Sequence, residues 1–142
     1  MKESSFAKLS KVPLLDHIED IVDLILLDDK KIDKEEWRTP TETEHLLLLA
    51  LLHDIGKVLP LMQRYNISRN EMNHEKRSLV FVKMLAEGGN YGENINAQLK
   101  RVVANLEKIA EGSSNATVKR FLEYDEKSRV LEMEELLEKE KI

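Results

Sequence analysis

The chain has 142 residues, 42% of them hydrophobic and 35% charged, which favours one compact domain with a core over a disordered chain. Its five glycines and three prolines are too few for the many turns of a sandwich or barrel, so an all-β fold is excluded. A net charge of −5 argues against coating nucleic acid by bulk electrostatics, and the absence of cysteine leaves His, Asp and Glu as the strong metal ligands.

The longest apolar run, residues 46–52, is far shorter than the about 20 residues that cross a bilayer. The N-terminus also lacks the hydrophobic segment of a signal peptide. We therefore expect a cytoplasmic protein that does not associate with a membrane.

Helix start and stop signals divide the chain into segments. Apolar residues at every third or fourth position predict a helix from Pro13 to about Asp28. Residues 39–42 combine a hydroxyl, a proline and a glutamate as at a helix start. The apolar run that follows predicts a central buried helix that is stopped by Gly56, with Pro60 marking the break.

Three further helices are expected in the second half of the chain. One begins near Ser68 or Asn73 and ends at 88–89, and the next covers about 95–111 and stops at Gly112. A capping residue within 113–115 starts the last helix. We therefore predict an all-α fold, an irregular bundle of five to six helices.

Adjacent His53 and Asp54 lie at the end of the most hydrophobic segment. Burial of two ionisable groups is costly, and a cation beyond the helix end would compensate both, with Lys57 one turn away to neutralise a phosphate. The alternative is a structural pair, in which Asp54 caps a neighbouring helix and His53 is an ordinary hydrogen-bonded core histidine.

Two more polar residues interrupt apolar helix faces. His17 lies at the edge of the apolar face of the first helix, and Asp125 lies three, four and seven residues after Leu122, Phe121 and Val118. With His53 and Asp54 they would form a set of two imidazoles and two carboxylates that suits Mn²⁺, Fe²⁺, Co²⁺, Ni²⁺ or Zn²⁺. Unrelated polar groups of the core are the alternative.

The run from Leu51 to Lys57 resembles the HD superfamily of metal-dependent phosphohydrolases. His17, the His53-Asp54 pair 36 residues later and the late Asp125 match the order of that family's ligands across most of the chain. The resemblance implies a single all-helical HD-type phosphohydrolase domain over 1–142. It also implies one or two divalent cations, Mn²⁺ first, with Mg²⁺, Ni²⁺, Co²⁺, Fe²⁺ or Zn²⁺ as alternatives.

Within that superfamily, residues 53–57 followed by Gln63, His74, Glu75 and Ser78 are similar to the HD nucleases of type I CRISPR systems. This similarity implies that His74 is a ligand for a second cation bridged through Asp54, with Glu75 and Ser78 supporting the site by hydrogen bonds. An exposed histidine at a helix start is the alternative for His74. That family normally has a further pair of histidines before the late Asp, and none follows His74 here.

The preferred hypothesis is a metal-dependent nuclease that cleaves single-stranded nucleic acid in CRISPR interference, an antiviral defence. Asp54 would orient the nucleophile and Lys57 would offset developing charge. The resemblance implies single-stranded DNA, a helicase subunit and a guide-RNA effector complex as partners. His45, which matches no position of the family, is interpreted as structural.

Two other functions remain open. One is a phosphohydrolase of a nucleotide or other small phosphate ester, which the missing histidines favour. The other is a degenerate HD domain that binds without turnover. A local excess of basic residues over 57–83 favours nucleic acid, although such residues are also typical of solvated helix faces.

Overall fold

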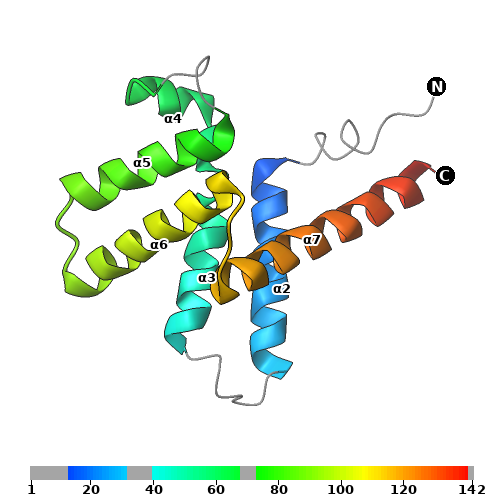
Figure 1. The fold of residues 1–142 in the computed structure, drawn as a ribbon. Helices are drawn as coiled ribbons and strands as arrows, with labels where there is room; N and C mark the ends of the chain where they lie inside the picture. Colours follow the sequence, from blue (N-terminus) through cyan, green and yellow to red (C-terminus); the bar gives the residue numbers. More distant parts are fainter. Residues whose placement is uncertain (1–12, 32–39, 68–72, 141–142) are drawn as a thin grey trace.

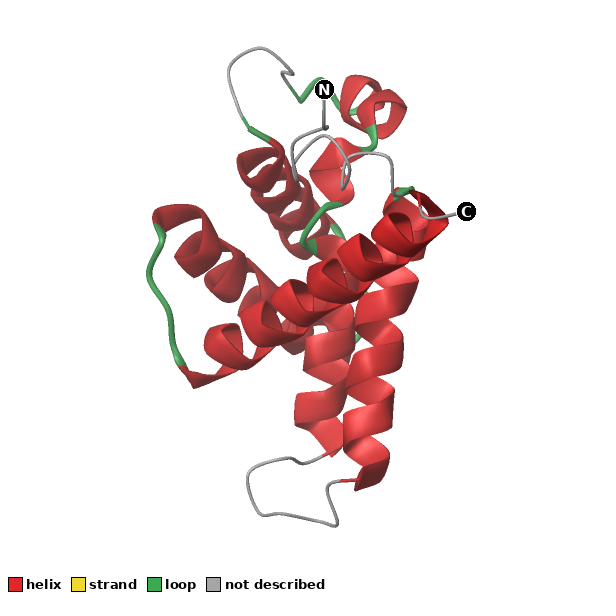
Figure 2. Ribbon diagram, turned by 90° about the vertical axis from the view of Figure 1, so that its right-hand side faces the viewer, coloured by secondary structure: helices red, strands yellow, loops and turns green. Residues whose placement is uncertain are grey.

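The computed structural model describes residues 13–31, 40–67 and 73–140, and these form helices and connecting loops without strands (Figures 1 and 2). The expected all-α bundle is therefore confirmed. In chain order the elements are α2 (Leu14–Lys31), α3 (Pro40–Leu52), the 3-10 helix η1 (Ile55–Lys57), α4 (Leu59–Arg64), α5 (His74–Gly88), α6 (Glu93–Glu111) and α7 (Ala116–Glu140).

The bundle is built from two antiparallel pairs and a crossing helix. Helices α2 and α3 lie side by side, α5 and α6 form a second pair, and the long α7 crosses the first pair (Figure 1). Their apolar faces meet in one core, which is formed mainly by Ile21, Ile25, Leu46, Leu49, Ala50, Phe81, Val82, Leu99, Val102, Leu106, Phe121 and Tyr124. The near-continuous apolar sequence of α3 is explained by its contacts with α2, α6 and α7.

The end of α3 differs from the sequence prediction. The helix ends at Leu52, so the residues that follow form a turn and then η1 instead of a last helical turn. Gly56 serves a different purpose from a helix stop, because a Cβ atom there would lie 2.2 Å from the carbonyl oxygen of His74 and 2.7 Å from the amide nitrogen of Ser78. The glycine therefore allows η1 to pack directly on the start of α5. Pro60 lies in the first turn of α4, a helix that the sequence analysis missed.

Other boundaries agree with the expected signals. Asn73 caps α5 by accepting a hydrogen bond from the Lys76 amide, at 2.9 Å. The alternative start at Ser68 lies outside the described residues. Gly112 ends α6 in the left-handed conformation, with φ of 76°.

A buried network connects α3 and α6 to the start of α7. The Nδ1 atom of His45 lies 3.2 Å from the Gln98 side-chain oxygen, and its Nε2 atom lies 2.7 Å from the Asn105 amide nitrogen. Asn115 donates to the Asn105 oxygen and accepts from the Val118 amide, so it caps α7. The network thus fixes where α7 begins, and His45 belongs to the packing between helices.

In the described part of the chain, no helix combines the length and hydrophobicity that a membrane span requires.

Candidate metal centre

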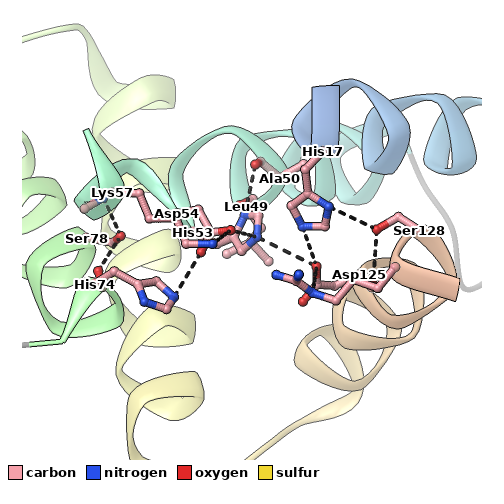
Figure 3. Close-up of polar contacts among 12 residues, drawn as sticks. His17, Leu49, Ala50, His53, Asp54, Lys57, His74, Ser78, Asp125 and Ser128 are labelled. Carbon is pink, nitrogen blue, oxygen red and sulfur yellow. Dashed lines mark hydrogen bonds and ion pairs between the residues drawn. The ribbon is translucent and has the colours of Figure 1, made fainter. Parts of the chain in front are cut away.

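Three side chains from distant parts of the chain meet inside the bundle. His17 on α2, His53 in the turn after α3 and Asp125 on α7 each offer one ligand atom, and these atoms lie within 4.8 Å of one another (Figure 3). The two histidines are buried, and the Asp125 side chain is 20% exposed. Three of the four residues predicted as ligands of one cation are therefore together.

The protonation of the His53 ring follows from its neighbours. Its Nδ1 atom lies 3.1 Å from the carbonyl oxygen of Leu49 and 3.0 Å from that of Ala50, and because carbonyls only accept, Nδ1 bears the proton. In the neutral ring the Nε2 atom then presents a lone pair. It lies 3.1 Å from Asp54 Oδ2 and 4.0 Å from Asp125 Oδ1, yet it has no hydrogen-bond partner among the described residues.

A buried lone pair that faces two carboxylates is unfavourable, because all three groups are acceptors. A proton or a cation between them removes the conflict. The ligand types, two imidazoles and one or two carboxylates, are those that first-row divalent metals bind. The residues therefore fit a divalent cation, and the unpartnered His53 nitrogen is the observation on which this fit rests.

His17 has a carboxylate at each ring nitrogen. Nε2 lies 2.9 Å from Asp125 Oδ1, and Nδ1 lies 2.8 Å from Glu132 Oε1. Burial alone lowers the pKa of His17, but the hydrogen bonds with Asp125 and Glu132 outweigh it and raise the pKa above its ordinary value of 6.5. Burial raises the pKa of Asp125, but the hydrogen bond with His17 and the charge of Arg129 outweigh it and lower the pKa below its ordinary value.

Asp54 lies beside this group without being one of the three residues whose ligand atoms converge. Its Oδ2 contacts His53, and also Lys57 Nζ at 3.3 Å, while its Oδ1 lies 3.3 Å from His74 Nε2 (Figure 3). Burial raises the pKa of Asp54, but its contacts with His53 and His74 and the charge of Lys57 outweigh this and hold the pKa well below its usual range. Asp54 is thus an ionised carboxylate between His53 and His74.

The start of α5 is held against the turn that contains His53 and Asp54. Ser78 accepts a hydrogen bond from the Gly56 amide at 2.8 Å and donates one to the His74 carbonyl at 2.9 Å. Arg77 donates from Nε to the Gly56 carbonyl at 2.8 Å. These bonds position the His74 ring beside Asp54, and Ser78 acts through the backbone instead of contacting the ligands.

A small cavity of about 90 Å³ opens over the cluster. Its lining consists of His53, Asp54, His74, Glu75, Ile109, Phe121, Leu122, Asp125 and Arg129. Arg129 Nε lies 3.6 Å from Asp125 Oδ1, and the Arg129 side chain is 37% exposed. One basic group therefore accompanies each carboxylate, Lys57 at Asp54 and Arg129 at Asp125.

Glu132 is the residue that the sequence analysis missed. Val118, Phe121, Asp125, Ser128 and Glu132 recur at helical spacing, and four of them are buried while Asp125 is partly buried. This buried face of the helix begins with apolar residues and continues with polar ones. Extending the same spacing past Asp125, through Ser128, would have identified Glu132.

Two basic residues of the stretch from residue 57 to 83 are engaged by groups of the protein itself. Besides the Arg77 contact with η1, Lys83 Nζ lies 3.1 Å from Glu107 Oε1 on α6. Arg69 lies outside the described residues. The stretch is therefore weaker support for a nucleic-acid surface than its sequence charge indicates.

Comparisons with models of protein families, with curated proteins and with solved structures give no match to this chain. The resemblance to the HD superfamily therefore remains a prediction, which rests on His17, His53, Asp54 and Asp125.

Proposed function

We propose that this protein is a metal-dependent phosphohydrolase of the HD type that cleaves phosphodiester bonds. The observation that supports this most is the buried Nε2 atom of His53, which has no hydrogen-bond partner among the described residues and faces Asp54 and Asp125 beside the His17 ring. A site of this kind is useful to an enzyme that needs a divalent cation close to solvent, and the small cavity provides that access.

His17, His53 and Asp125 would hold the cation, and Asp54 and His74 are the residues available for a second one. When bound, such a cation lowers the pKa of a water molecule and polarises a phosphoryl oxygen. Asp54, which is ionised, accepts a hydrogen bond from the attacking water and so orients it.

Lys57 and Arg129 supply positive charge for the phosphate group. Both side chains are more than one third exposed, so each can turn from its carboxylate toward an anion in the cavity. They offset the negative charge that develops on the phosphoryl oxygens. This assigns Lys57 the role expected from the sequence and adds Arg129.

Single-stranded nucleic acid, in particular DNA, is the proposed substrate, on the resemblance to CRISPR HD nucleases. A helicase subunit and a guide-RNA effector complex are the partners which that resemblance implies. Hydrolysis of a nucleotide or other small phosphate ester is the second candidate. It is favoured because Arg77 already binds the Gly56 carbonyl and Lys83 is already paired with Glu107, whereas a polymer needs basic surface beyond the scissile phosphate.

The test is a hydrolysis assay with Mn²⁺ on single-stranded DNA and, in parallel, on a panel of nucleotides. We expect Asp54→Ala and Asp125→Asn to abolish turnover while circular dichroism shows the helices intact. Glu126→Gln is the matched control, since Glu126 is the exposed neighbour of Asp125. Retained cleavage in the Asp54 and Asp125 variants would contradict the proposal, and turnover of nucleotides alone would select the second candidate.

A further inference from the structure

Glu132 is a buried carboxylate on the face of α7 that also provides Asp125. Its side chain is 3% exposed, and Oε1 lies 2.8 Å from His17 Nδ1. A carboxylate this deeply buried needs a donor, and the Nδ1–H group of His17 is one. Ser128, between them on the same face, donates to the Asp125 carbonyl at 2.7 Å and lies 3.5 Å from His17 Nδ1, so Glu132 is the closer partner of this nitrogen.

The contact decides which nitrogen of His17 faces the other ligands. With Nδ1 donating to Glu132, the Nε2 atom points to Asp125, on the side where His53 lies. His53 has the same tautomer through a different contact, because its Nδ1 donates to backbone carbonyl oxygens of α3. The two histidines thus present Nε2 to the centre, His53 supported by backbone carbonyl groups and His17 by a side-chain carboxyl group.

We propose that Glu132 is a positioning residue of the cation site: it holds the His17 ring with Nε2 toward the centre and increases the electron-donating strength of that nitrogen. The inference rests on the proposed function. A carboxylate behind a ligating imidazole fixes its tautomer and orientation, and loss of such a partner typically weakens metal binding by about 10- to 100-fold. Glu132 would not touch substrate or cation.

The experiment compares Glu132→Gln and Glu132→Ala with the wild type. Mn²⁺ affinity is measured by calorimetry, Co²⁺ coordination by visible absorption, and thermal unfolding without added metal. Glu135→Gln is the matched control, because Glu135 is an exposed carboxylate that lines the same acidic hollow between α2 and α7 as Glu132. It removes one negative charge there while leaving the His17 contact intact.

We expect Glu132→Gln to weaken Mn²⁺ binding about tenfold and Glu132→Ala up to about 100-fold, with an altered Co²⁺ spectrum and no effect of Glu135→Gln. The inference would be overturned if Glu132→Gln bound Mn²⁺ with wild-type affinity and gave the wild-type Co²⁺ spectrum. This holds even if the unfolding temperature of the variant falls. Glu132→Gln keeps the test decisive if the alanine variant does not fold. Failure of the wild type to bind Mn²⁺ or Co²⁺ would instead contradict the proposed function.

Discussion

Replacing Gly56 by alanine tests whether close packing of η1 on α5 holds the site together. The added Cβ would lie 2.2 Å from the His74 carbonyl oxygen and 2.7 Å from the Ser78 amide nitrogen. Both are backbone atoms and cannot rotate away. Since ordinary contacts begin at 3.4 Å, η1 has to move by about 1.2 Å to relieve the contact with the His74 carbonyl oxygen.

The expected loss of stability can be worked out from the contacts that break. Overpacking of this kind costs about 1–3 kcal/mol. The movement also disturbs the hydrogen bonds from the Gly56 amide to Ser78 and from Arg77 to the Gly56 carbonyl, worth about 0.5–1.5 kcal/mol each. Alanine recovers about 0.4–1 kcal/mol by restricting the unfolded chain. The net destabilisation is about 3 kcal/mol.

Urea unfolding of the Gly56→Ala and Gly88→Ala variants measures this effect. Gly88 is the control, because a Cβ at that last position of α5 meets no atom within 4 Å, and we expect it to be neutral or slightly stabilising. Gly56→Ala should also bind Mn²⁺ more weakly, since the turn with His53 and Asp54 moves with η1. A Gly56→Ala protein as stable as the wild type would refute the packing argument.

Three further predictions concern α3, α7 and the cavity. Burial and the charge of Arg101 lower the pKa of His45 from 6.5 to about 4, so the folded protein should lose about 3 kcal/mol of stability as the pH falls from 6.5 to 4. Urea unfolding at a series of pH values should show this decrease in the wild type. A His45→Gln protein with the same pH dependence would disprove the assignment. Asn115→Ala should destabilise the protein by about 1–2 kcal/mol, because the cap of α7 is lost. Ser114→Ala is the control in the same unfolding assay and should be neutral. Arg129→Ala should lower kcat about 100-fold with Mn²⁺ affinity retained, and unchanged kcat would remove Arg129 from the mechanism.

Most helices could be predicted because their signals are local. Asn73 and Gly112 act within one turn of the helix ends that they define, and the alternation of apolar residues needs no knowledge of the partner helix. The end of α3 could not be predicted this way. Gly56 is required by the approach of α5, a tertiary contact that no local pattern contains.

The candidate site was predictable only in part. The position of His17 on its helix indicated that it points inward, and its side chain is 5% exposed. Its meeting with Asp125, 108 residues away, depends on how α7 crosses α2, which spacing along the chain does not determine. Glu132 was missed because a glutamate on a charged helix usually faces solvent, and only its register with Asp125 distinguishes it.

The central claim is that one divalent cation binds between α2, the turn after α3 and α7. The most direct measurement is a crystal structure of the protein grown with Mn²⁺, with anomalous diffraction to locate the metal. We predict a peak bonded to the Nε2 atoms of His17 and His53 and to a carboxylate oxygen of Asp125. Full Mn²⁺ saturation in solution without a peak at these three residues would contradict the account.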